Sequence, residues 1–295
     1  MTTENVADMP GRRGPLHVDP RLPLPFRLLF TAFNTAVAAI DSAIAVQTSV
    51  TRYVNGPQIL LRSKPLRIEA ARTVARTEEY RIHPCVRESI AVMEMAVMSA
   101  GFGAPHRITH GSPAELRSVG ALLEHAATGD LANIVCIVSG ATETPKLTRT
   151  ITFVTEFTDS HRLYTTNSGT TVMWPPPPGH DVVRFTGVDD ARELYALHRF
   201  RVERRARTVP PLPTTRGATE AERLAYIDRE SQAFQRHLIQ IGYREPSPDG
   251  LRHTVRGATL TAWRTMWPWK QWTDATHRRR ARAVMRARAQ ATARG

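Results

Sequence analysis

The spacing of hydrophobic residues predicts several amphipathic helices. Within residues 26–44 and again within 86–97 and 224–241, hydrophobic side chains recur every three or four residues, which places them on one helix face. Residues 116–123 show a shorter hydrophobic face after Ser112-Pro113, a typical helix start, so we expect a fourth helix there. Asp189 or Asp190 is expected to cap a further helix, and Thr219 with Glu222 forms a capping box.

Other segments have the pattern of β-strands. Residues 131–138 end in a run of β-branched and apolar side chains, and residues 147–158 alternate between apolar and polar positions. A turn at Asp159-Ser160 leads into 162–173, and Pro248-Asp249-Gly250 predicts a hairpin over 241–256. We therefore expect an α+β fold, with amphipathic helices packed on a small, mostly antiparallel sheet of the first three segments, which the hairpin can extend.

Composition shifts along the chain predict four regions. Residues 1–25 are rich in Pro, Gly and charge and lack a hydrophobic period, so we expect a disordered arm. Residues 26–80 form an N-terminal helical segment, 81–273 the α+β core and 274–295 an arginine-rich tail.

The helix predicted over 26–50 has a polar stripe as well as an apolar face. Arg27, Asn34, Asp41 and Thr48 recur every seven residues. Asp41 and Asn34 would face hydrocarbon unpaired in a lipid-exposed span, so we expect no integral membrane span. The helix packs on a partner, either in this core or in a second copy of the chain, and the alternative is a helix lying in the membrane plane.

The totals fit a globular cytoplasmic protein. Hydrophobic residues make up 41% of the 295 residues, and the chain has only two cysteines, which favours a reducing compartment. The N-terminal residues lack the order of a secretory signal, so we expect a cytoplasmic location with association at a membrane surface as an option. The net charge is +13, and residues 278–295 alone hold seven Arg and no acid.

The C-terminal segment carries the least ordinary chemistry. Four of the five tryptophans lie within ten residues, just before the arginine run. Indole favours the membrane–water boundary and stacks on bases, while Arg is attracted to lipid head groups and to phosphates. The arginines are too spread in sequence for one helix face, so we expect the tail to need an anionic partner for order. The expected anionic-surface residues are Trp269, Lys270, Trp272, Arg278, Arg279, Arg280, Arg282, Arg286 and Arg288.

Motifs for catalysis, metal or cofactor binding do not stand out. Neither His83 with Cys85 nor His106 with His110 completes a zinc ligand set, and nucleotide-binding loops are missing, so we expect no catalytic residue, metal or cofactor. The hairpin from Thr155 to Asn167 gathers polar side chains on two strands. Glu156 is the candidate acid or base there, although strand alternation places it opposite Phe153 and Phe157, towards solvent.

We therefore expect a non-catalytic cytoplasmic protein that attaches peripherally to an anionic membrane through its C-terminal Trp and Arg residues. The alternative is a nucleic-acid-binding protein, for which a basic sheet face continuous with the tail would be the sign. The second alternative is an enzyme with a pocket near the hairpin over 150–167, supported if Glu156 contacts a His or Arg in a cleft. Self-association through residues 26–50 is the remaining partner hypothesis.

Overall fold

The structure, a computed structural model, divides the chain into two compact units, Met1–Gly56 and Pro57–Gly295. The residues that the structure describes are 55–66, 69–110, 115–139, 146–169, 174–212, 219–266 and 268–293. All of the elements named below belong to the second unit. The predicted arm over 1–25 and the predicted helix over 26–50 lie outside the described residues.

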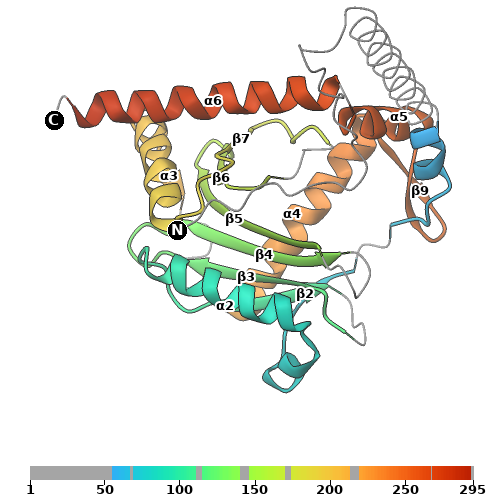
Figure 1. The fold of residues 1–295 in the computed structure, drawn as a ribbon, viewed down its shortest axis with the longest axis horizontal. Helices are drawn as coiled ribbons and strands as arrows, with labels where there is room; N and C mark the ends of the chain where they lie inside the picture. The colour runs from blue at the N-terminus through green and yellow to red at the C-terminus, as the bar shows by residue number, and fades with distance from the viewer. Residues whose placement is uncertain are drawn as a thin grey trace, which may run out of the picture. The chain divides into compact units, whose positions relative to one another are not determined.

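A largely antiparallel sheet forms the centre of the second unit (Figure 1). Its strands pair in the order β1 (Ala71–Thr73), β2 (His106–His110), β3 (Ser118–Glu124), β4 (Leu131–Ser139), β5 (Lys146–Phe157), β6 (Arg162–Thr166) and β7 (His180–Arg184), and β8 (Pro211–Leu212) pairs with β5. The α+β class is confirmed. The prediction of a small sheet is wrong, because five strands join the three that the alternation pattern indicated.

Strand β3 replaces the helix that was predicted over 116–123. Val119 and Leu123 enter the main core, whereas Leu122 packs on the opposite face beside Tyr226. A strand that is buried on both faces reads as a continuous apolar run without strict alternation, and this run happens to fit helical spacing.

The parallel pairing of β6 with β7 has a consequence for the connecting chain. Parallel neighbours need a crossover, because the chain must return to the starting end of the sheet. Residues 167–179 make this return, and their described part includes Trp174 and the proline run Pro175–Pro178. The rigid connector therefore crosses near the edge of the sheet, where it borders the cavity described below.

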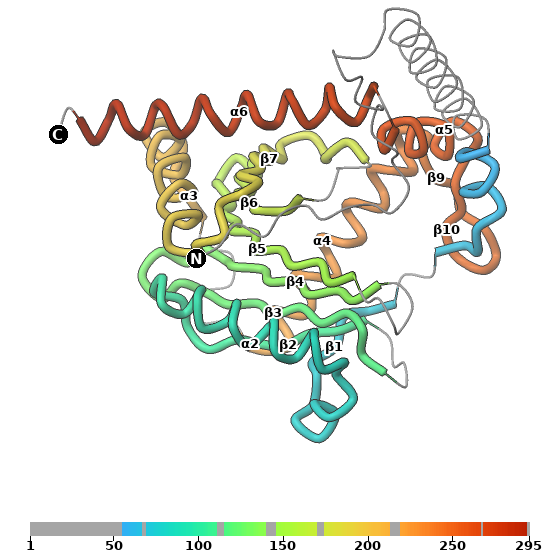
Figure 2. The backbone as a smooth tube through the Cα atoms, viewed as in Figure 1, coloured from blue at the N-terminus to red at the C-terminus, as the bar shows by residue number. Residues whose placement is uncertain are grey.

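Helices cover both faces of the sheet (Figures 1 and 2). The bounds are η1 (Arg76–Arg81, a 3-10 helix), α2 (Pro84–Met98), α3 (Ala191–Ala206), α4 (Glu220–Gln240), α5 (Val255–Arg264) and α6 (Trp269–Thr292). Helices α2 and α3 pack on one face, where Ile90 and Leu194 are fully buried in the main core. Helix α4 packs on the other face, where Tyr226 joins Leu131 and Val154.

Two of the predicted helix starts are confirmed, those of α3 and α4. The side chain of Asp190 accepts a hydrogen bond from the Arg192 amide at the start of α3. Thr219 and Glu222 form the predicted capping box of α4. These local side-chain contacts satisfy amide groups that have no partner within the helix, so they can be read from the sequence directly.

The hairpin of β9 (Arg244–Ser247) and β10 (Gly250–His253) forms a separate two-stranded sheet. The prediction that it extends the main sheet is therefore wrong. The hairpin instead packs against α5, whose Gly257 approaches Tyr243 so closely that a Cβ atom there would lie 1.9 Å from the Tyr243 carbonyl oxygen.

Helix α6 differs from the tail expected at the C-terminus. The segment forms one continuous helix of 24 residues, about 36 Å long. Small Ala281 is buried in the main core, and Val284 packs against the same core. The tail was expected to need an anionic partner for order, but the small side chain of Ala281 lets the backbone of α6 approach the body and pack there.

Candidate functional site

The arginines of α6 divide between two sides of the helix. Position 281 faces the core, and the exposed Arg278, Arg279, Arg282 and Arg286 lie on another side. At 3.6 residues per turn these four positions fall within an arc of about 100°, which widens to about 120° when Trp272 is included. We call these five residues the outer face of α6. The expectation that the arginines are too spread for one helix face therefore holds for the six arginines of α6 taken together. These four, however, do share one face.

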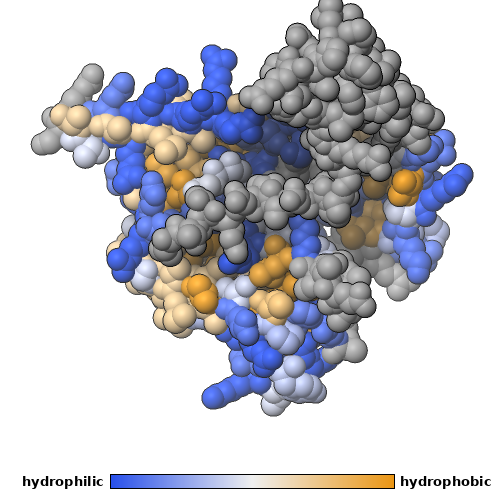
Figure 3. Space-filling model, viewed as in Figure 1, coloured by the Kyte–Doolittle hydropathy of each residue, from blue (hydrophilic) through white to orange (hydrophobic). Residues whose placement is uncertain are grey.

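The outer face is basic and uncompensated. In the part of the chain that the structure describes, these four arginines make no ion pair. Arg282 reaches only the Arg278 carbonyl oxygen, at 3.4 Å. The Trp272 side chain is 67% exposed and meets Trp269 edge to face, with ring centroids 5.8 Å apart. Hydrophilic side chains project from the side of α6 that is turned away from the sheet (Figure 3).

The remaining residues of the predicted anionic-surface set have partners inside the protein or lie elsewhere. Lys270 pairs with Asp274 at 2.7 Å, and Arg280 pairs with Asp181 of β7. Arg288 is partly buried where α6 passes α3. The Lys270 pair lies within α6, the Arg280 pair links α6 to the sheet, and Arg288 faces α3, so the structure does not bring the nine predicted residues onto one surface.

A cavity of about 1090 Å³ lies between the sheet edge and helices α4, α5 and α6. Its apolar lining includes Trp174, Phe234, Leu260, Trp263, Trp269 and Trp272. Trp174 and Phe234 meet edge to face at 6.1 Å between ring centroids. We call this cavity the aromatic pocket. Sequence reasoning placed Trp269 and Trp272 on an anionic surface and did not link them with Trp174, so it missed that these side chains line one cavity.

A polar cluster lies at the sheet side of the aromatic pocket. Arg162 binds Glu156 at 3.1 Å and forms a second, shorter ion pair with Glu230, which lines the pocket. Burial raises the pKa of Glu230. Burial and the positive charge of Arg162 lower the pKa of His180 to about 4, so this lining side chain is neutral at pH 7.

Glu156 points away from Phe153 and Phe157, as strand alternation predicted, but α4 covers this face of the sheet. The Glu156 side chain is 13% exposed and contacts Arg162 rather than solvent. It is not among the residues that line the aromatic pocket. The hypothesis of an enzyme with a pocket near this hairpin stays a prediction. The carboxylate that lines the aromatic pocket is that of Glu230, not that of Glu156.

A chain of hydrogen bonds runs through the core beside α3. Fully buried His198 lies between the hydroxyls of Thr155, 2.8 Å from Nε2, and Thr165, 2.9 Å from Nδ1. The guanidinium of Arg201 donates to the Thr165 oxygen at 2.8 Å, and Thr155 donates to Asp130.

Each hydrogen bond of this network can be assigned a donor and an acceptor. Because Arg201 can only donate, the Thr165 hydroxyl is free to donate to Nδ1, which places the His198 proton on Nε2. Burial lowers the pKa of His198 to about 3, so the ring is neutral at pH 7. Burial opposes ionisation of Asp130, yet hydrogen bonds from Thr155 and Thr128 and the charge of Arg199 lower its pKa. This network of hydrogen bonds holds α3 to the sheet. It is closed to solvent, so a substrate cannot reach it.

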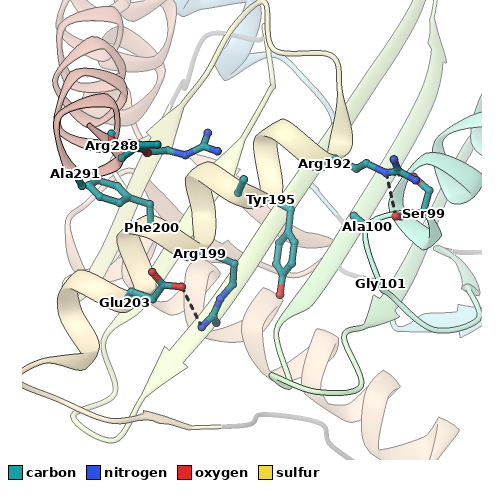
Figure 4. A pocket seen from close by; sticks show the side chains of 12 residues that line it. Ser99, Ala100, Gly101, Arg192, Tyr195, Arg199, Phe200, Glu203, Arg288 and Ala291 are labelled. Atoms are coloured by element: carbon teal, nitrogen blue, oxygen red, sulfur yellow. Dashed lines mark hydrogen bonds and ion pairs between the residues drawn. The ribbon is translucent and has the colours of Figure 1, made fainter. Parts of the chain in front are cut away.

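A second, more open depression of about 750 Å³ lies on the surface outside this network of hydrogen bonds (Figure 4). Arg192 and Arg199 of α3 line it together with Arg288 of α6. Arg192 is bound to the Ser99 carbonyl oxygen at 3.0 Å, and Arg199 to Asp130 at 3.0 Å. Two of the three cations are therefore already held by the protein.

Comparison of the chain with known protein families, curated proteins and solved structures finds no match. Among the residues that the structure describes, no three His, Cys, Asp or Glu side chains gather to hold a metal ion. None of the described helices is long and apolar enough to cross a membrane.

Proposed function

We propose that the protein attaches peripherally to an anionic membrane surface through the outer face of α6. The observation that carries this proposal is the set of four exposed arginines on one side of a docked helix, without ion pairs among the described residues and next to an exposed indole. The helix is already ordered by Ala281, so binding does not cost the entropy of folding a tail.

The charge of the outer face is large enough for this role. Each basic residue close to an anionic leaflet contributes about 1 kcal/mol. The four arginines would then contribute about 4 kcal/mol, which corresponds to about a thousandfold change in membrane partitioning. This attraction falls with ionic strength, because the exposed charges are screened beyond about 10 Å at 0.1 M salt.

Two features favour a membrane over a nucleic acid. The exposed Trp272 lies at one end of the arginine face, where an indole can enter the head-group region. The central strands offer no open basic platform, because α2 and α3 pack on one face and α4 packs on the other. A nucleic-acid-binding protein stays the alternative outcome of the test.

The test is co-sedimentation of the full chain with vesicles. The wild type should bind vesicles of phosphatidylcholine with 30% phosphatidylserine at 50 mM NaCl, and should bind pure phosphatidylcholine weakly. Replacing all four arginines of the outer face by Gln should reduce partitioning by about a thousandfold. The matched control replaces four exposed arginines of other elements by Gln, with the same charge change: Arg76, Arg87, Arg149 and Arg236.

The control variant should retain most of the binding. Equal losses in both variants would show that net charge, rather than the outer face, causes the attraction. The wild type could fail to bind anionic vesicles at low salt and yet bind a single-stranded oligonucleotide through the same four arginines. In that case the membrane proposal is wrong, and the nucleic-acid alternative takes its place.

A further inference from the structure

The aromatic pocket is built for a small molecule rather than for a protein segment. Its volume of about 1090 Å³ is of the size that encloses a drug-sized ligand. Its walls come from α4, α5, the first turns of α6 and the crossover between β6 and β7, so one ligand would touch four separate parts of the fold.

The lining requires an apolar body. Trp174, Phe234, Leu260 and Trp263 supply wide, flat surfaces, and Pro175–Pro177 add a rigid apolar wall. Burying these surfaces against a ring system or an acyl chain is favourable in proportion to the apolar area removed from water. A strongly hydrated ligand would lose its water here without compensation.

The charge balance of the pocket selects an anionic group. Arg201 and Arg280 share the carboxylate of Asp181, whereas Glu156 and Glu230 share the guanidinium of Arg162, so the charges of these six side chains sum to zero. Burial lowers the pKa of His180 to about 4. Within the described residues, Arg264 is a lining cation without an ion pair, and its guanidinium lies 5.9 Å from the centre of the Tyr243 ring.

Two lining residues also carry buried polar nitrogens that lack a partner among the described residues. These atoms are Nε1 of Trp174 and Nδ1 of His277. An indole N–H can only donate, so it needs an acceptor. Leaving such a donor unsatisfied costs free energy, but both nitrogens are closed to solvent in the structure, so the proposal below does not depend on them.

We propose that the aromatic pocket binds an anionic amphiphile, a small molecule with an aromatic or aliphatic body and one anionic group that Arg264 neutralises. This binding goes beyond attachment through α6. The pocket shares Trp272 with the outer face, but Arg264 and the α4 wall do not belong to the outer face, so ligand binding can be tested separately from attachment.

The test uses two probes that share one ring system. 1-Anilinonaphthalene-8-sulfonate is anionic, and N-phenyl-1-naphthylamine is its neutral counterpart. In fluorescence titrations of the full chain at pH 7.5, without vesicles, we expect saturable binding of the sulfonate at least tenfold tighter than that of the neutral amine.

Three variants separate the contributions. Arg264→Gln should weaken sulfonate binding about tenfold and leave the neutral amine unchanged. Arg256→Gln removes an exposed charge from the same helix outside the pocket and should change neither affinity. Ser231→Trp fills the pocket from α4 and should abolish binding of both probes.

Three results would overturn the proposal: unsaturable binding, equal affinities for the two probes, or the same affinities in Arg264→Gln as in Arg256→Gln. Failure of vesicle binding would leave these results unaffected, because no membrane is present in the titration.

Discussion

Replacing His198 by Gln should remove a pH-dependent part of the free energy of unfolding. The ring of His198 is fully buried between two threonine hydroxyls, and burial lowers its pKa to about 3. In the unfolded chain a histidine has a pKa near 6.5. Between these values the unfolded state binds a proton that the folded state does not, so the stability present above pH 6.5 is lost as the pH falls towards 3.

The size of the effect follows from the two pKa values. Through proton linkage, the free energy of unfolding falls with pH below 6.5, with a slope that approaches about 1.4 kcal/mol per pH unit. Lowering the pH from 7 to 4.5 should therefore reduce the free energy of unfolding of the wild type by about 2.5 kcal/mol through His198 alone. Gln cannot titrate. The destabilisation caused by His198→Gln, about 2 to 4 kcal/mol at pH 7 from the lost buried hydrogen bonds, should therefore shrink by about 2.5 kcal/mol at pH 4.5.

The assay is urea unfolding followed by circular dichroism at 222 nm, at pH 7.0, 5.5 and 4.5 and constant ionic strength, with comparison of midpoints at equal m-values. His110→Gln changes an exposed histidine of β2 and should leave the pH dependence as in the wild type. If the wild type and His198→Gln lose stability in parallel between pH 7 and 4.5, then His198 is not a neutral buried ring in the folded protein and the reasoning is refuted.

Two further predictions concern packing. Gly257→Ala should lower stability by several kcal/mol in thermal unfolding, because a Cβ atom would lie 1.9 Å from the Tyr243 carbonyl oxygen, whereas Gly169→Ala, with nothing within 4 Å, should be close to neutral; equal midpoints would contradict this close approach. Ala281→Arg should undock α6 and make it sensitive to limited trypsin digestion, while Ala283→Arg on the exposed side should digest as the wild type does.

Local patterns predicted the elements that carry a clear period, a capping signal or a turn. Helix α2 follows its hydrophobic spacing, α4 begins at its capping box, and the β5–β6 pair follows its alternation and its turn. Strand β3 was not predicted correctly because burial on both faces removes the alternation on which the prediction depends. The eight-stranded extent of the sheet was missed for a different reason, since several short strands give too few positions to show a period.

The candidate sites depend on contacts between distant parts of the chain. The tryptophans near the C-terminus form an obvious sequence cluster, but Trp174 and Phe234 meet them only in the folded protein. Likewise, nothing local links Asp130 with His198, although Thr155 joins them in the core. The basic outer face of α6 could have been found by placing the arginines on a helical wheel, once a helix was assumed.

The order of the strands has a consequence for how the chain folds. From β2 to β6 each strand pairs with the next along the sequence, so the sheet can grow by closing short loops, at low entropic cost. Among the described residues, the main core draws on residues between Val74 and Leu197 and, from far along the chain, on Ala281. During synthesis the sheet can therefore assemble before α6 emerges, and α6 then covers the part of the core that Ala281 joins.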